Sequence, residues 1–588
     1  MMNILARFSN RLAARLQAHS SGQLGKLPFV RALGSQAAAS HEDSNAYRWA
    51  ALVGLTGALV TGAAAFASQA DALEQEQKKT KIVILGTGWG ATSFLNALKL
   101  KKNPLYDVQV VSPRNYFLFS PLLPAAATGT VDTKSIVDPI RGHLDRSCNY
   151  FKAEALQINH KEKTVTCCYE KPVWRTCDLA GKDKVFDLSY DVLIVAVGAV
   201  TNTFGVPGVT DHCFFLKSAE DAKAIRERVN ACFELANLPD STEEDRKRLL
   251  SFVVAGGGPT GTELAAELND LIFEDMIRYF PRVQRSDISI RQIDSHDHIL
   301  SAFDRSISAY ATDHFRRSGI DLILNCRIKA VEENRVVVLD QTKNEMRQVP
   351  FGTCIWTTGI RMHPLAEKLA QQLQAQEHWR SLKVDRHLLV KGTQDIFALG
   401  DASTIEQEKV FSHAEELFEE GDTNHDGKLS SEELQDLLMR ERKRYPQLIE
   451  IAARVPPNSE LTKEDFQGHL AELDKSLRSV PATAQVAHQE GHYLGKLFRK
   501  HHISGSGLPE DAPEFVYNNK GSLAYIGGDK AVIDPGEAMN FLKYIKGWFM
   551  GFGWKSAEIA MQASLKNQLA VMYDFMKTKM FGRDISDI

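Results

Sequence analysis

One twelve-residue stretch carries oxygen ligands at the spacing of a calcium-binding loop. Side-chain oxygens fall at loop positions 1, 3, 5, 9 and 12, and Gly427 stands at position 6, where such a loop must turn sharply. Position 7 is a lysine that would bind through its backbone carbonyl, so its basic side chain does not interfere. The spacing predicts a calcium site formed by Asp422, Asn424, Asp426, Lys428 and Glu433.

Apolar residues on both sides of this loop repeat at helical spacing, as the helices of an EF-hand require. They are Phe411, Leu417 and Phe418 before the loop, and Leu434, Leu437 and Leu438 after it. Residues 454–465 resemble a second loop that has lost its ligands, and we interpret them as a silent partner that braces the first. These patterns predict an EF-hand insertion over residues 411–475.

The first of two glycine-rich turns follows an apolar strand at 81–85 and precedes an apolar helix. Its motif residues are Gly86, Gly88, Trp89 and Ala91. Gly86 permits the tight turn, Gly88 lets a pyrophosphate approach the backbone, and Ala91 allows close packing of helix and strand. The acid expected after the next strand is replaced by Ser112, which hydrogen-bonds a ribose hydroxyl less strongly than a carboxylate does.

The second glycine-rich turn contains all three motif glycines, Gly256, Gly258 and Gly261. The strand that follows it ends at Asp294, where a carboxylate accepts hydrogen bonds from an adenosine ribose. A carboxylate at this position repels a 2′-phosphate, so the sequence favours NADH over NADPH. Nearby basic residues, among them Arg291, keep the NADPH alternative open.

Two further apolar strands suit the crossings between two nucleotide-binding domains. One ends at Gly198, and the other ends at Gly400 and Asp401, where the hydroxyls of a flavin ribityl chain would lie. Two dinucleotide units in one chain predict an α/β fold with two Rossmann-type domains. The calcium loop and a C-terminal amphipathic segment would be additions to that fold.

The N-terminal region differs from the rest of the chain in composition. Residues 1–41 combine recurring arginines with serine and alanine and carry no acid before position 42, which is typical of a mitochondrial presequence. A disordered basic tail is the alternative. Residues 47–70 are almost free of charge and form a candidate membrane anchor, the alternative being a cleaved sorting segment.

Composition and the C-terminus limit the partners. The net charge of −4 gives no electrostatic footprint for nucleic acid. No C-x-x-C pair occurs, which argues against a flavin disulfide reductase. Aromatic and basic residues interleave between 539 and 580, as in a segment that lies on a membrane surface. The alternative for this segment is a dimerisation or core helix, and we expect a homodimer.

These motifs together resemble the type II NAD(P)H:quinone oxidoreductases, specifically the external, calcium-binding mitochondrial kind of plants and fungi. The resemblance covers about residues 80–530 and a short match at 581–584. It is carried by the segments 86–91, 112–124, 256–263, 356–360, 400–401, 484–491 and 521–527. It implies bound FAD despite Ser112, with hydride transfer from NADH to FAD and two-electron reduction of ubiquinone without proton pumping. It also implies a peripheral enzyme of the mitochondrial inner membrane, and exposure to cytosolic calcium favours the face toward the intermembrane space.

The resemblance assigns a domain to each part of the chain. The expected FAD-binding domain has two parts, 78–248 and 379–410, and the NAD(P)H-binding domain occupies 249–378. Residues 476–530 would border flavin and quinone, and residues 531–588 would associate with the membrane.

The resemblance also implies roles for four residues. Glu263 would lie near nicotinamide and flavin, where it positions substrate or delivers a proton, and Gly359 would border the NAD site. Gln485 and His488 would orient a quinone carbonyl. The residues alone also allow Glu263 to be a helix first-turn acid and His488 to be a satisfied helix histidine.

Two other functions remain open at this point. One is a flavin reductase for a protein electron carrier, similar to the apoptosis-inducing-factor flavoproteins. The other is a calcium sensor on a redox-inactive scaffold.

Overall fold

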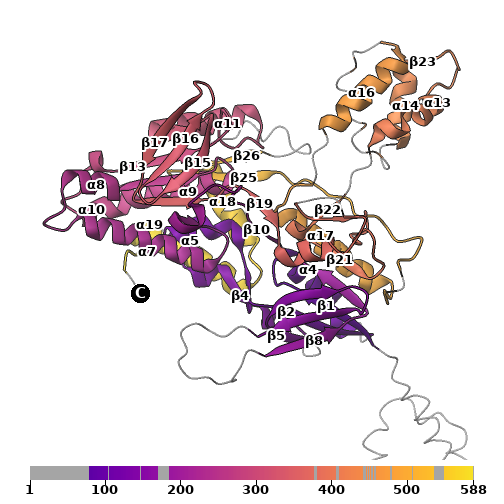
Figure 1. Ribbon diagram of the computed structural model, residues 1–588, viewed down its shortest axis with the longest axis horizontal. Helices are drawn as coiled ribbons and strands as arrows, with labels where there is room; N and C mark the ends of the chain where they lie inside the picture. Colours follow the sequence, from indigo (N-terminus) through magenta and orange to yellow (C-terminus); the bar gives the residue numbers. More distant parts are fainter. Residues whose placement is uncertain are drawn as a thin grey trace, which may run out of the picture. The chain divides into compact units, whose positions relative to one another are not determined.

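The computed structural model describes residues 79–586, except 103–104, 146–147, 170–183, 377–379, 406–408, most of 442–458, 477–479, 506 and 535–547 (Figure 1). The predicted presequence at 1–41 and the candidate anchor at 47–70 lie outside the described residues. Among the residues that the structure describes, no helix has both the length and the apolar character needed to cross a bilayer.

The first glycine turn lies in a parallel five-stranded sheet with the order β21-β9-β1-β2-β5 (Figure 1). Its strands are β1 (Thr80–Leu85), β2 (Tyr106–Ser112), β5 (Asn149–Lys152), β9 (Val192–Val195) and β21 (Ile396–Ala398). Residues 82–85 of β1 are fully buried, because a parallel sheet is covered on both faces. Helix α4 (Trp89–Leu98) follows β1, and α17 (Ala484–Lys500) packs against α4.

The second glycine turn lies in a sheet of the same kind, with the order β11-β18-β12-β13-β14. Its strands are β11 (Cys213–Phe215), β12 (Ser251–Ala255), β13 (Ser289–Ile293), β14 (Ile320–Ile323) and β18 (Thr353–Trp356). Strand β12 leads into α9 (Pro259–Asp270), which continues as a π-helix over Leu271–Met276. In both sheets the strand before the glycine turn is the central one, so the predicted α/β fold is confirmed.

Antiparallel strands complete the two domains. Strand β10 (Ala199–Thr201) pairs with β19 (Ile360–Met362), and each directly follows a glycine of positive φ, Gly198 or Gly359. Three-stranded sheets are formed by β6 (Glu154–Asn159), β7 (Thr164–Cys168) and β8 (Val185–Ser189), and by β15 (Cys326–Glu332), β16 (Arg335–Asp340) and β17 (Glu345–Pro350). The longer remaining helices here are α7 (Ala219–Ala236), α8 (Glu243–Leu249), α11 (Arg305–Ser318) and α12 (Pro364–Ala370).

The predicted calcium loop lies in a helix–loop–helix unit with its own core. The helices are α13 (Ala414–Gly421), α14 (Ser431–Glu441) and α16 (Lys463–Ser476). Strand β23 (Lys428–Leu429) pairs with β24 (Leu461–Thr462), which is the contact expected of a bracing second loop. Residues 454 and 456–458 of that second loop lie outside the described residues. Five of the six predicted apolar residues are buried, but Phe411 is 50% exposed, because α13 begins only at Ala414.

The C-terminal region packs one of its faces on the second domain. The hairpin of β25 (Ser522–Gly527) and β26 (Lys530–Asp534) contacts α9, α11 and α18 (Trp548–Ala560). Helix α19 (Leu565–Phe581) follows, and Trp554, Val571 and Phe575 from these two helices are buried in the same core cluster as Tyr525. This face of the segment is therefore a core element, as one of the two interpretations of the sequence allowed.

Candidate active site

The first glycine turn has the geometry of a phosphate cradle. Gly86 has φ +108°, and a Cβ there would stand 2.3 Å from the carbonyl oxygen of Ala196, so no other residue fits. Helix α4 begins at Trp89, and Gly88 before it provides no side-chain cap, so the first N–H groups of the helix are available to an anion. A Cβ at Gly88 would meet nothing within 4 Å, which leaves room for a pyrophosphate in front of the helix.

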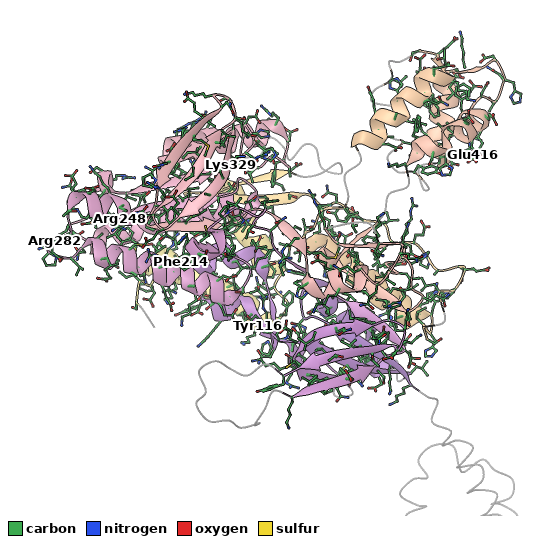
Figure 2. The ribbon with its side chains drawn as sticks, in the orientation of Figure 1. Tyr116, Phe214, Arg248, Arg282, Lys329 and Glu416 are labelled. Carbon is green, nitrogen blue, oxygen red and sulfur yellow. The ribbon has the colours of Figure 1, made fainter. Side chains whose placement is uncertain are left out.

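The hydroxyl that replaces the ribose-binding acid lies beside this cradle. Thr87 Oγ1 lies 3.2 Å from Ser112 Oγ and donates to the carbonyl oxygen of Tyr116 at 3.0 Å. Tyr116 is labelled in Figure 2 and belongs to β3 (Tyr116–Leu118). Trp89 packs on the same segment, with its ring centroid 5.0 Å from that of Phe117. The hydroxyl of Ser112 at the end of β2 and that of Thr87 in the glycine turn therefore fit a ribose of an adenine dinucleotide.

The second glycine turn repeats this geometry more tightly. Gly256 has φ +121°, and Gly258, directly before α9, provides no side-chain cap. A Cβ at Gly261 would stand 2.2 Å from the carbonyl oxygen of Gly256, whereas the equivalent Ala91 carries its methyl in the core. Asp294 Oδ2 accepts a 2.5 Å hydrogen bond from the N–H of Gly257, which holds the carboxylate at the edge of the turn. This arrangement fits a second dinucleotide with a free ribose diol.

Helix α17 packs against the helix of the first cradle, α4, through small residues. A Cβ at Gly491 would stand 2.2 Å from the carbonyl oxygen of Gly90, so the two helices touch backbone to backbone. Glu490 is 2% exposed and accepts a 2.6 Å hydrogen bond from the N–H of Gly400. Burial raises the pKa of Glu490 to about 8. Asp401, next to Gly400, lies 3.9 Å from the ammonium of Lys217. Glu490 and Lys217 had no separate signal in the sequence.

His488 lies on the same helix, close to the first cradle. Its Nδ1 is 2.7 Å from Ser93 Oγ, and its ring centroid is 6.4 Å from that of Trp89. Burial, together with the charge of Lys520, lowers the pKa of His488, which keeps the imidazole neutral near pH 7. The imidazole is thus a satisfied helix histidine at the position predicted to border flavin. Its contact with quinone stays a prediction.

A short segment connects the helix α17 to the helix α9. Gln485 Oε1 accepts from the hydroxyl of Tyr517 and from the N–H of Lys520, both at 2.9 Å. Gln485 Nε2 donates to the carbonyl oxygen of Gly521 at 3.1 Å. Four residues later, the N–H of Tyr525 donates to Glu263 Oε1 at 3.3 Å. Residues 517–525 therefore join Gln485 and Glu263 through one short segment, a connection that sequence spacing could not predict.

Helix α9 carries a row of acids. Burial raises the pKa of Glu263 well above its usual range, and the charges of Glu558 and Glu267 raise it further. Burial and the charge of Glu267 raise the pKa of Asp270 to about 7. Arg583 is 7% exposed and lies 3.6 Å from Glu267 and 2.9 Å from Asp275. The sequence indicated Arg583 only as part of the short terminal match.

In the predicted calcium loop, carboxylate side chains accept hydrogen bonds from backbone N–H groups of the same loop. Gly427 has φ +80°, and its N–H donates to Asp422 Oδ2 at 2.9 Å. Hydrogen bonds from Thr423 and Ser430 lower the pKa of Glu433 to about 2. In the part of the chain that the structure describes, no group of three or more His, Cys, Asp or Glu side chains is clustered to hold a metal ion. The loop's donors are all oxygens, which fits calcium, and the site stays a prediction.

Comparison with known proteins identifies the family. Residues 80–421 match the pyridine nucleotide-disulphide oxidoreductase family, and residues 519–584 match the NDH2 C-terminal domain. The chain is 38% identical to the mitochondrial external alternative NAD(P)H-ubiquinone oxidoreductase B1 of Solanum tuberosum, over 88% of this chain and 92% of that protein. It is 35% identical to the mitochondrial external alternative NADH-ubiquinone oxidoreductase of Yarrowia lipolytica, over 88% and 82%.

A solved structure gives the same result. NDH2 of Plasmodium falciparum in complex with NADH is 32% identical, with a TM-score of 0.74, over 87% of this chain and 100% of that one. Because the chain has two glycine cradles and is similar to these relatives over most of its length, it belongs to the type II NAD(P)H:quinone oxidoreductases.

Proposed function

We propose that this chain oxidises NADH and reduces ubiquinone through a bound FAD, without pumping protons, at the mitochondrial inner membrane. The observation that carries the proposal is the segment 517–525, which contacts Gln485 on one side and Glu263 on the other. The names of the Solanum and Yarrowia relatives support the substrates and the mitochondrial location. FAD, when bound, accepts hydride from the nicotinamide and passes on electrons in pairs.

In this proposal the first cradle holds FAD. Gly86 permits the tight turn, and the N–H groups at Gly88 and the start of α4 bind the pyrophosphate, with Trp89 and Ala91 packed behind them. Ser112 binds the ribose, Gly198 ends the neighbouring strand beside the turn, and Gly400 with Asp401 binds the ribityl chain. Because α17 packs on this cradle, the cofactor is retained between turnovers.

The second cradle binds and releases NADH. Gly256, Gly258 and Gly261 admit the pyrophosphate, and Gly359 lies at the start of the crossing strand β19. Asp294 accepts hydrogen bonds from the ribose and repels a 2′-phosphate, which makes NADH the preferred substrate.

The proposed catalytic residues come from α9, which carries Glu263, and from α17, which carries Gln485 and His488. Glu263 positions the nicotinamide or delivers a proton, and its raised pKa favours the protonated form. Gln485 and His488 orient the quinone carbonyl from one face of α17. The protein aligns the reactants, and that alignment is its main contribution to the rate.

A matched pair of glutamines tests the quinone assignment. Gln489 binds the same segment one turn along α17, through hydrogen bonds with the backbone of Asn518. We expect Gln485→Leu to slow reoxidation of reduced flavin by ubiquinone about tenfold or more, while NADH reduces the flavin at an unchanged rate. Gln489→Leu should leave both half-reactions nearly intact. Equal effects of the two substitutions would refute the role of Gln485.

Calcium regulation rests on the loop of residues 422–433. Bound calcium would replace the backbone hydrogen bonds of Asp422 and Glu433 and stiffen the unit of α13, α14 and α16. We expect added calcium to raise the unfolding temperature of this unit and to change the ubiquinone reductase rate. Glu433→Gln should abolish both effects, whereas Glu432→Gln, at the adjacent exposed position, should not. A rate and KM that do not respond to calcium would refute regulation.

The free face of α19 is proposed to bind the membrane surface that faces the intermembrane space. Its exposed apolar residues repeat at helical spacing: Leu565, Leu569, Met572, Tyr573, Met576 and Met580. Lys566 and Lys577 lie on the same helix and suit anionic headgroups. Leu569→Glu should weaken co-sedimentation with anionic vesicles, whereas Glu244→Gln on α8 should not. Loss of a homodimer without loss of vesicle binding would instead assign the face to dimerisation.

A further inference from the structure

Helix α18 carries one buried acid that none of the roles above uses. Glu558 is 5% exposed, and among the described residues its Oε2 has no hydrogen-bond partner. Lys555 on the same helix does not neutralise Glu558, because its ammonium is paired with Asp529 at 2.7 Å. A buried carboxyl group without a partner is costly to a fold, so its presence needs a functional explanation.

The packing of α18 places Glu558 near Glu263. The ring of Trp554 stacks on that of Tyr525 with centroids 5.0 Å apart. Glu558 lies four residues after Trp554 and therefore on the same face of the helix. The N–H of Tyr525 donates to Glu263 Oε1. Two carboxyl groups, one from each helix, thus lie near the strand of Tyr525, and the charge of Glu558 acts on Glu263.

We propose that Glu558 and Glu263 form an acid pair that holds a single proton and supplies it when ubiquinone is reduced. This inference rests on the proposed function and deepens it, because it makes α18 part of the active site. Oxidation of one NADH to NAD⁺ releases a hydride, which is two electrons and one proton. Conversion of ubiquinone to ubiquinol needs two electrons and two protons. One proton per turnover must therefore come from water, and the pair passes it on and is then reloaded.

The surrounding charges support a shared proton. Burial raises the pKa of Glu558 to about 8 and, with the charges of Glu558 and Glu267, raises that of Glu263. Asp270 and Glu267 on α9 add negative charge, while Arg583 lies against Glu267. His314 of α11 stays neutral because burial lowers its pKa. Two such acids do not both ionise at neutral pH, and they titrate as a pair with two apparent pKa values.

The test uses Glu558→Gln in the full-length flavin-loaded protein, with Glu244→Gln as control. Flavin reduction by NADH and its reoxidation by short-chain ubiquinone are followed separately by stopped flow between about pH 6 and about pH 9. Wild-type reoxidation should fall as the pH rises through the upper pKa of the pair. In Glu558→Gln that decline should move to lower pH, because the lone Glu263 loses its proton earlier. Reoxidation at about pH 8 should then be about tenfold slower, with flavin reduction unchanged.

An infrared measurement tests the pair without turnover. The carbonyl band of protonated carboxyl groups that titrates near pH 8 should be as strong in Glu244→Gln as in wild type and weaker in Glu558→Gln, where Glu490 still contributes to it. Equal amplitudes of the band in wild type and Glu558→Gln, or a variant whose rate is reduced equally at every pH, would overturn the acid pair. Failure of NADH to reduce the wild-type flavin contradicts the proposed function instead.

Discussion

The two cradle helices, α4 and α9, are alike at the end that faces phosphate and differ in what supports them. Both begin directly after a glycine that provides no side-chain cap, and that glycine lies two residues beyond a glycine of positive φ. Helix α4 is held by backbone contact with α17 through Gly90 and Gly491. Helix α9 is held by charge, because Arg583 from the C-terminus lies against Glu267 and its neighbours.

This difference in support suggests how one chain can retain FAD and exchange NADH. A cradle covered by a second helix favours a resident cofactor, as proposed for FAD. The second cradle has a carboxylate, Asp294, at its edge, which is proposed to bind the ribose of NADH.

The largest effect is expected from removing the charge support of α9. Arg583→Ala leaves Glu267 and Asp275 buried without their cation, which should lower the free energy of unfolding by about 3–5 kcal/mol. Arg583 also opposes the rise in the pKa of Asp270, which burial and Glu267 bring to about 7, so without Arg583 this pKa lies further above its unfolded value and the loss should grow as the pH rises. Urea unfolding at about pH 6 and about pH 8 measures this, and Arg583→Lys should recover part of the stability. A loss below about 1 kcal/mol would show that charge does not hold α9.

A smaller effect is expected from separating α17 and α4. Gly491→Ala adds a methyl group against the carbonyl oxygen of Gly90, which should cost about 1–3 kcal/mol and reduce the flavin retained after purification. Gly468→Ala is the control, because a Cβ at this position of α16 meets nothing within 4 Å. Absorbance of the purified proteins gives the flavin content. Full flavin content in Gly491→Ala would contradict the role of α17 as a cover.

The smallest effect is expected at the edge of the second cradle. Asp294→Ser gives this cradle the residue type that the first has at Ser112, and it should raise the KM for NADH about tenfold. The discrimination against NADPH should fall at the same time, because the repulsion of a 2′-phosphate is removed. Asp297→Ser, at an exposed position that pairs with Arg305, serves as control in steady-state assays with both nucleotides. An unchanged preference for NADH over NADPH in Asp294→Ser would show that Asp294 does not determine which nucleotide binds.

Local patterns in the sequence were enough to predict the cradles and the sheets around them. Gly86, Gly256 and Asp294 lie where the strand–turn–helix pattern places them, because that unit is determined by backbone geometry within a few residues. The partners of these elements could not be predicted. Tyr525 reaches Glu263 from 262 positions away in the chain, and Arg583 contacts Asp275 across 308. The prediction that Phe411 packs in the core of the calcium-loop unit was wrong for a local reason, because helical spacing does not show where a helix begins.

Stopped-flow spectroscopy of the bound flavin tests the central claim most directly. Freshly purified protein should be yellow, and NADH should bleach it faster than NADPH does. Ubiquinone should then restore the colour in a separate step. Protein that carries no flavin, or a flavin that NADH reduces but ubiquinone does not reoxidise, would contradict the proposed transfer of electrons between the two cradles and quinone.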